Sequence, residues 1–323
     1  MQCGTSRKEQ NESRNQVNIN GKKGVDISSA NGNVSMEKIK KAGYDFVMIR
    51  CGYGSDIASQ DDSQFENNVR KCEAAGIPWG AYLYSYALNT DEAKSEARHA
   101  ARLLRNKKPT LPIAFDMEDG DGYKQRNGMP DNSTLVAICK TFLSEIKKQG
   151  YYPMLYSSLS WLNNRLNDKS LLTSYDIWVA QWSSSCTYKG KYGMWQYGGE
   201  VNYIDGNSIA GVGTIDKDKA YKDYPSIIKN GGYNNWKKPD GKVLDSSGYV
   251  KGDKSTGVFA LKELLLISKQ LKISTQGMDQ NNIFGEGTEK AVNQILKKGG
   301  YVQNGTAGNN FVKYLYGLIK AKI

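Results

Sequence analysis

Two carboxylic acids at the end of an apolar stretch are the residues of this sequence best suited to chemistry. Residues 111–115 are apolar, Asp116 and Glu118 follow, and glycines at 120 and 122 then interrupt the pattern, which predicts a strand over 111–118. Side chains two positions apart on a strand share a face, with Cβ atoms about 6.5 Å apart. Asp116 and Glu118 can therefore face one cavity, with Asp119 turned away.

Two carboxyl groups at that separation favour general acid–base chemistry. Their repulsion in a partly desolvated site raises the pKa of one, which then keeps a proton at neutral pH while the other stays charged. Such a pair is the equipment that hydrolyses glycosidic bonds. Acids that face water or pair with lysine are the common alternative for an isolated Asp-x-Glu, so the rest of the chain has to support the motif.

Composition disfavours the other usual catalytic sites. The 323 residues include one histidine, His99, in a segment that predicts a helix, so catalysis by Ser-His-Asp or Cys-His and histidine-based metal sites are not expected. The five cysteines are scattered without Cys-x-x-Cys spacing, which indicates neither a disulfide framework nor a zinc site. We expect no metal and no cofactor, and acid–base work falls to carboxylates.

The charge of the chain favours an anionic polymer as partner. The net charge is +11, and the part from Lys237 onward, with 14 Lys against 7 Asp and Glu, contributes +7 of it. Nucleic acid, an anionic membrane or bacterial wall would each satisfy this balance. There is no run of five basic residues and no zinc finger or RNA-recognition motif, which favours wall polymer over nucleic acid. No apolar run approaches the roughly 18 residues needed to cross a bilayer.

Short apolar runs alternate with amphipathic segments, which predicts an α/β fold with a parallel sheet built by crossovers. We expect strands at residues 24–28, 45–51, 79–87, 111–118, 153–157 and 176–182, and helices at residues 36–42, 63–75, 91–104 and 132–149. Plain strands at 193–197 and 213–217 then close the sheet. The predicted fold is an irregular, TIM-like (β/α) barrel, whose active site belongs at the C-terminal ends of the strands.

Acidic and aromatic residues gather at those predicted strand ends. Asp26 and Asp216 add carboxylates to the central pair. The other residues expected to bind substrate there are Arg50, Tyr53, Tyr82, Tyr84, Tyr86, Tyr156, Gln181, Trp182, Trp195 and Gln196. A carboxylate floor walled by tyrosine and tryptophan is what a polysaccharide groove requires.

The remainder of the chain divides into three segments. Residues 1–22 are polar and aperiodic, which predicts a disordered lead-in, and no signal peptide pattern is present. An ordinary polar tail is favoured there over lipoprotein anchoring at Cys3. The catalytic barrel is expected at 23–228, a glycine- and lysine-rich linker at 229–256, and a small all-α domain of three helices at 257–323.

Seven segments, in order, resemble the glycoside hydrolase family 25 lysozymes, which are bacterial and phage muramidases. The resemblance covers about residues 23–224. It rests on Gly24-Val25-Asp26-Ile27-Ser28 and on residues 49–54, 80–87, 112–118, 177–182, 194–197 and 214–216. One departure is Lys217-Asp218-Lys219-Ala220, which is more charged than is usual in the family and leaves the register of the last strand open.

The resemblance implies hydrolysis of the β-1,4 bond from N-acetylmuramic acid to N-acetylglucosamine in peptidoglycan. Glu118 resembles the general acid, with a pKa raised by the neighbouring acids, and Asp116 the partner that orients the substrate N-acetyl group or stabilises positive charge. Asp26 and Asp216 match two further acids of the cavity floor. We favour participation by the substrate's own acetamido group. The place of action implied is the bacterial cell wall, reached by secretion or by release in phage lysis.

The C-terminal segment carries a weaker resemblance. Residues 281–292 are similar to the turn and helix of small three-helix peptidoglycan-binding domains, with Asn281-Asn282 in place of Asp-Gly. A plain helical appendage that self-associates weakly is the alternative. For the whole chain, the alternatives are a wall-binding protein whose barrel has little activity and, from charge alone, a nucleic-acid binder.

Overall fold

The structure, a computed structural model, describes residues 17–238 and 241–323 and divides into two compact units. The first comprises residues 19–222 and 233–236, and the second the described residues of 1–18 with 223–232 and 237–323. The expectations for residues 1–16, Cys3 included, lie outside the described residues. Ile19 is fully buried and the Gly21 amide donates to the carbonyl of Ala220, so ordered structure begins before residue 23.

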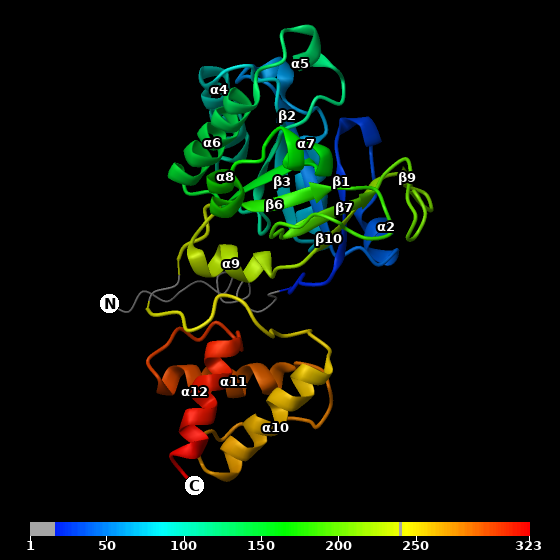
Figure 1. The fold of residues 1–323 in the computed structure, drawn as a ribbon. Coiled ribbons are helices and arrows are strands. Elements are labelled where there is room, and N and C mark those ends of the chain that lie inside the picture. Colours follow the sequence, from blue (N-terminus) through cyan, green and yellow to red (C-terminus); the bar gives the residue numbers. More distant parts are fainter. Residues whose placement is uncertain (1–16, 239–240) are drawn as a thin grey trace, which may run out of the picture. The chain divides into compact units, whose positions relative to one another are not determined.

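Eight strands close a barrel in the first unit (Figure 1). They are β1 (Lys23–Ile27), β2 (Phe46–Tyr53), β3 (Trp79–Tyr84), β4 (Ile113–Asp116), β5 (Pro153–Ser158), β6 (Asp176–Ala180), β7 (Met194–Gly198) and β10 (Asp216–Ala220). From β1 to β7 each strand is parallel to the next, and β10 closes the barrel antiparallel to both β7 and β1. The predicted irregular barrel with plain closing strands is confirmed.

Helices connect the parallel strands from β1 to β6, and β7 follows β6 without one. In chain order the connecting helices are α2 (Met36–Lys41), α3 (Phe65–Ala75), α4 (Thr90–Leu104), α5 (Tyr123–Arg126), α6 (Asn132–Lys148), α7 (Leu159–Asn164) and α8 (Lys169–Ser174). A further helix, α9 (Tyr224–Gly231), follows the last strand. Side-chain caps fix several helix starts: at the start of α6, Asp131 accepts from the Thr134 amide at 2.7 Å. The short helices α7 and α8 were not predicted, because six residues are too few to show helical periodicity.

The apolar core of this unit lies between the outer faces of the strands and the helices. Val47 and Ile49 of β2 and Leu83 of β3 belong to it, and the ring of Phe115 on β4 stacks on Phe142 of α6 with centroids 4.0 Å apart. Alternate strand residues face inward. The barrel interior is apolar at the amino ends of the strands, where Gly24 leaves the space that the Phe46 ring occupies. The polar residues of the interior therefore lie at the carboxyl ends of the strands.

The antiparallel direction of β10 decides which of its residues reach that end. Asp216 begins the strand and pairs in register with Asp26, near the end of β1. The predicted strand at 213–217 is wrong in its bounds: residues 213–214 form β9 (Gly213–Thr214), which pairs with β8 (Ser208–Ile209), and β10 starts only at 216. The chain reverses in between, which a sequence pattern of alternating polar residues does not reveal.

The second unit carries three helices with their own apolar core. They are α10 (Thr256–Gln270), α11 (Glu286–Lys298) and α12 (Asn309–Lys320), and Phe284 and Phe311 are fully buried among them. This agrees with the expected additional helical region. Within the described ranges no helix is both long and apolar enough to cross a membrane.

Part of the predicted linker is ordered against the barrel. The Asn234 side chain donates to the carbonyls of Pro109 and Leu111, at 3.1 and 2.8 Å, and accepts from the Tyr152 amide at 2.9 Å. Residues 233–236 therefore belong to the barrel unit, although the residues before and after them in the sequence belong to the other unit.

Candidate active site

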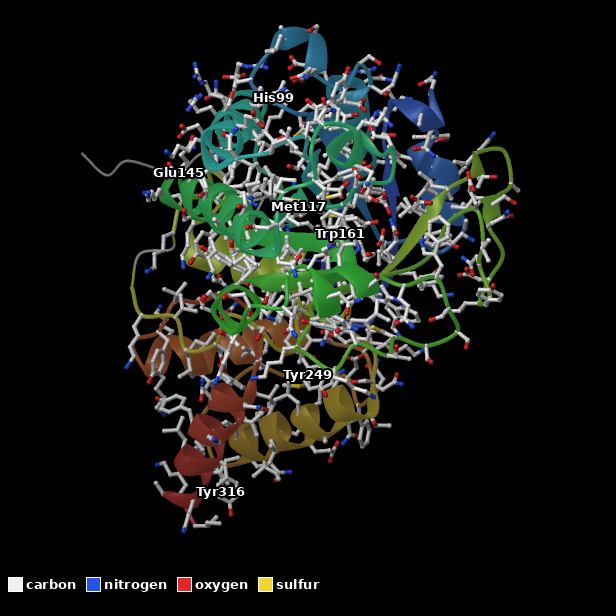
Figure 2. All side chains as sticks on the ribbon, turned by 45° about the horizontal axis from the view of Figure 1, so that its top comes forward. His99, Met117, Glu145, Trp161, Tyr249 and Tyr316 are labelled. Atoms are coloured by element: carbon white, nitrogen blue, oxygen red, sulfur yellow. The ribbon has the colours of Figure 1, made fainter. Side chains whose placement is uncertain are left out.

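The predicted carboxylate pair lies at the end of β4. Asp116 is the last residue of the strand and its side chain is 4% exposed, while Glu118 is only partly buried. The charge of Glu118 raises the pKa of Asp116, so the two carboxyl groups lie close enough to interact. Figure 2 labels Met117, the buried residue between them in the chain. The structure brings the two acids together, with Glu118 just beyond the strand instead of on it.

Asp26 and Asp216 lie on the neighbouring strands β1 and β10. Their backbones are directly paired, and the charge of Asp216 raises the pKa of Asp26. The charge of Glu118 also raises the pKa of Asp216. Gly199 comes so close to Asp216 that a Cβ there would lie 2.3 Å from Oδ1, so only glycine allows this approach. All four predicted acids therefore share one end of the barrel.

Burial dominates the protonation of these acids. It is the largest cause raising the pKa of Asp116, whose second cause is the charge of Glu118. Burial likewise raises the pKa of Glu118, whereas its interaction with Asp116 lowers it. Burial raises the pKa of Asp216 to about 6 and that of Asp26 well above its usual range. The acids together hold protons to a higher pH than isolated carboxyls would.

Gln196 of β7 organises the floor beside the acids. Its Nε2 donates to Asp26 Oδ2 at 2.8 Å, and its Oε1 accepts from the Tyr156 hydroxyl and from Trp182 Nε1, both at 3.0 Å. Gln196 and Tyr156 are buried, whereas Trp182 is 39% exposed. This network locks the Gln196 amide in one orientation, so that it presents a donor to Asp26.

Tyrosines form one wall of the site. Tyr82 lies near Asp26 and Asp116, Tyr84 near Glu118, and Tyr86 reaches Asp121 with its hydroxyl at 2.7 Å. The Tyr86 ring contacts those of Tyr84 and Tyr53, with centroids 5.4 and 5.8 Å away. Flat amphipathic rings beside carboxylates suit the faces and hydroxyls of sugars.

Three predicted binding residues make other contacts. Arg50 donates to Asp62 Oδ2 at 2.8 Å, although its charge still acts on Asp116. The Gln181 amide bonds to Thr187, and Trp195 Nε1 donates to the Gln181 carbonyl at 2.8 Å. Trp195 is adjacent to Gln196 on β7 and therefore faces the opposite side of the sheet. These contacts support the rim of the barrel.

Sequence reasoning missed Asp218. It is fully buried on β10 and accepts from Trp178 Nε1 at 2.8 Å, and its charge raises the pKa of Asp26. Asp216 and Asp218 repeat the i, i+2 spacing of the central pair, and that spacing was the available signal. The charged segment from Lys217 to Ala220, taken as a departure, is instead a strand with alternate acids directed inward.

His99 has a structural environment. It is fully buried on α4, with Nδ1 3.0 Å from the Gly54 carbonyl oxygen and Nε2 2.8 Å from Asp61 Oδ1; Figure 2 labels it. Over residues 17–238 and 241–323, no group of three or more His, Cys, Asp or Glu side chains is arranged to hold a metal ion. The chemistry available at the barrel end is that of carboxyl groups.

Comparison with known proteins agrees with this geometry. The family model for glycosyl hydrolases family 25 matches residues 25–206. Lysozyme M1 of Streptomyces globisporus is 23% identical over 209 residues, which cover 63% of this chain and 69% of that protein. The N,O-diacetylmuramidase of Arthroderma benhamiae is 28% identical over 165 residues, or 50% of this chain and 68% of that protein.

A solved structure shares the barrel. The modular autolysin LytC from Streptococcus pneumoniae superposes with a TM-score of 0.52 at 29% identity, over 61% of this chain and 46% of that one. This chain thus spans less than half of that autolysin.

A barrel with paired carboxyl groups at its C-terminal end and a match to a hydrolase family over more than half of its length defines a glycoside hydrolase. The chain belongs to glycosyl hydrolases family 25, and it is an enzyme of the lysozyme, or muramidase, type. The enzyme class and family expected from the sequence are confirmed.

The raised pKa of Asp216 predicts a gain in stability when its charge is removed. Asp216 has a pKa of about 6 in the folded protein against 3.8 for an ordinary Asp, so folding loses about 3 kcal/mol as pH rises through this interval. Asp216→Asn should therefore unfold with about 2–3 kcal/mol more free energy than wild type at pH 7, with no gain at pH 3.5. The measurement is urea unfolding followed by tryptophan fluorescence, since all six tryptophans lie between residues 79 and 236.

The control for this prediction is Glu73→Gln, which removes an exposed acid from α3. Its free energy of unfolding should stay close to that of wild type at both pH values. A gain for Asp216→Asn that is the same at pH 3.5 and pH 7 would contradict ionisation as its cause.

Proposed function

We propose that this enzyme hydrolyses the β-1,4 bond between N-acetylmuramic acid and N-acetylglucosamine in peptidoglycan, with Glu118 as proton donor and Asp116 as its charged partner. The observation that carries the proposal is the pair of interacting carboxyl groups, Asp116 and Glu118, at the carboxyl end of the barrel. The LytC autolysin, a relative in fold and sequence, has been solved with a synthetic peptidoglycan ligand. The tyrosine wall and the net positive charge suit an anionic glycan.

Exposure supports the division of roles within the pair. Glu118 is partly exposed and can reach the leaving oxygen of a bound sugar, whereas Asp116 lies beneath it and is 4% exposed. Glu118 would donate the proton that the pair shares as the glycosidic bond breaks, and the ionised Asp116 would then face the positive charge that develops near the anomeric carbon. Asp216 would add negative charge to this cavity above its pKa of about 6, and Gln196 holds the carboxyl group of Asp26 in place.

The closeness of the two carboxyl groups bears on the route. Inverting hydrolysis places a water between carboxyls about 6.5–9.5 Å apart, whereas Asp116 and Glu118 lie close enough for each to shift the pKa of the other. A nucleophilic Asp116 would need open access to the anomeric carbon, which its burial restricts. The oxygen of the substrate's N-acetyl group would instead attack that carbon, with Asp116 orienting the acetamide N–H. Water then opens the intermediate while Glu118 accepts its proton.

Removal of the proposed donor should abolish wall digestion. Glu118→Gln is expected to lower kcat by about 10²–10⁴-fold, because the amide cannot protonate the leaving oxygen. Activity is measured by mass spectrometry of fragments released from purified cell walls, where a muramic acid reducing end identifies the bond cut. The matched control is Glu145→Gln on α6 (labelled in Figure 2), whose carboxylate bonds to Lys148. Undiminished digestion by Glu118→Gln would overturn the proposed role.

Participation of the substrate acetamide predicts retention at the anomeric carbon. Two successive displacements at the same carbon restore its configuration. Proton NMR of the product, recorded before the anomers equilibrate, should show the β-anomer first. Initial appearance of the α-anomer would exclude this route, but it would leave the assignment of Glu118 as donor intact.

We also propose that the helical unit formed by α10, α11 and α12 binds the wall. The segment that resembles wall-binding domains contributes Phe284 to its core and Thr288 to the buried start of α11, and Tyr316 of α12 is 59% exposed. The full chain with Glu118→Gln should co-sediment with purified walls, and the added change Tyr316→Ala should weaken this. Concentration-dependent sedimentation without wall binding would favour the self-associating appendage, and salt-sensitive retention on DNA alone would favour nucleic acid.

A further inference from the structure

Lys124 is a buried cation directly behind the carboxylate pair. It lies in α5, in the loop that follows β4, and its side chain is fully buried. Its Nζ donates to the carbonyl oxygen of Glu118 at 2.9 Å and to the carbonyl oxygen of Ser85. An ammonium group in such a place is costly unless hydrogen bonds and opposite charges compensate it, so its presence needs an explanation.

The compensation comes from a chain of contacts that reaches α4. Ser85, whose carbonyl accepts from Lys124, donates its hydroxyl to Glu96 Oε2 at 2.9 Å. Glu96 is 1% exposed, and its Oε1 accepts the Tyr86 and Ala87 amides at 2.7 and 3.1 Å. A buried carboxyl on α4, the loop after β3 and the buried ammonium are thus linked, and the link ends on the main chain of Glu118.

Glu118, whose main chain Lys124 contacts, lies just beyond the last paired residue of β4. The ladder of β4 ends at Asp116, which pairs with Tyr84 and Tyr156. Glu118 lies two residues beyond, before the glycine-containing turn. Lys124 is itself held there, because Asp119 Oδ1 accepts its amide and Asp119 Oδ2 accepts the amide of Gln125 at 3.0 Å. The ammonium therefore closes a small loop that starts and ends beside Glu118.

We infer that Lys124 is a positioning residue for the reaction: it fixes the main chain of Glu118 and places a positive charge next to the Asp116–Glu118 pair. The inference rests on the proposed function, in which Glu118 donates the proton. A methionine could fill the same volume, but it could bind neither carbonyl oxygen and would carry no charge.

The charge of Lys124 opposes the effect of burial on the pair. It lowers the pKa of Asp116 and that of Glu118, and in both cases desolvation is the larger and opposite cause. Other titratable or charged groups face Glu118, Asp116 or Lys124 from the surrounding elements. They are Arg50 of β2, Tyr84 of β3, Glu96 of α4, Asp119 and Asp121 of the loop, Cys139 of α6, Tyr156 of β5 and Asp216 of β10.

The test is the pH dependence of kcat for Lys124→Met on purified glycan strands from which the peptides have been removed. The alkaline limb of the profile reports loss of the proton that the pair must donate. Without the ammonium this proton is held more tightly, so the limb should move up by about one pH unit. At the optimum, kcat should fall by about 10–100-fold, because a loosely held donor is misaligned, while KM stays within about threefold of wild type.

Lys262→Met is the matched control. Lys262 of α10 is also fully buried and donates to the Ile283 carbonyl at 2.9 Å, but it belongs to the other unit. It should lower the stability of the helical unit and leave the pH profile unchanged. Lys124→Gln serves if the methionine variant does not fold, because its amide can still donate to the carbonyls while the charge is lost; the same shift of the limb is expected.

A folded Lys124→Met or Lys124→Gln variant with the wild-type alkaline limb would overturn the inference. So would an equal shift in the Lys262→Met control. Glu118→Gln, assayed in parallel, separates this failure from failure of the proposed function. If Glu118→Gln is inactive and the Lys124 variants resemble wild type, only the positioning role fails; if Glu118→Gln stays active, the proposed proton donor is wrong.

Discussion

The constraint on which the site depends is the burial of several carboxyl groups at one end of a barrel. Asp26, Asp116 and Asp218 are at most 6% exposed, and Glu118 and Asp216 lie beside them. Desolvation makes each charge costly, and each charge raises the pKa of its neighbours. The acids cannot all be ionised at neutral pH. The protein therefore contains a reservoir of protons at the place where a glycosidic oxygen would need one, at the expense of stability.

The topology explains how so many acids meet. Seven parallel strands bring only their carboxyl ends to this side of the barrel, and the last of them would ordinarily be followed by another crossover. The antiparallel β10 instead brings its first residue, Asp216, to the same side, and Asp218 follows on the inner face. Donors from neighbouring strands then fix the orientations: Gln196 of β7 binds Asp26, and Trp178 of β6 binds Asp218. The closing strands β7 and β10, which no helix connects to their neighbours, thus complete the acidic end of the barrel.

The order of the strands could be predicted from sequence because β1 to β6 are short apolar runs separated by amphipathic helices, and their spacing is a local signal. The central pair and Asp26 were accessible for the same reason, since each follows or ends such a run. Asp218 was missed although it repeats the i, i+2 spacing of the central pair, because its strand alternates acid with lysine and resembles a solvated edge. Only the barrel shows that Lys217 packs under the 205–206 loop, with Nζ 2.6 Å from the Gly206 carbonyl oxygen, while the acids face inward. Contacts such as that of Gln196 with Asp26, 170 positions apart, leave no local trace.

Lysine is used here in two ways that composition cannot distinguish. Most of the 44 basic residues contribute to the surface charge that suggested an anionic partner. Lys124, Lys217 and Lys262, however, are at most 1% exposed, and each donates to main-chain carbonyls of a loop next to a strand or helix end. Such a loop has carbonyl groups that no ladder satisfies, and a flexible side chain with three donors can satisfy several of them at once. In the barrel this makes a lysine part of the architecture that presents the carboxyl groups. The positive charge is thus both outside, where it suits an anionic polymer, and inside, where it limits how far burial can raise the pKa values of Asp116 and Glu118.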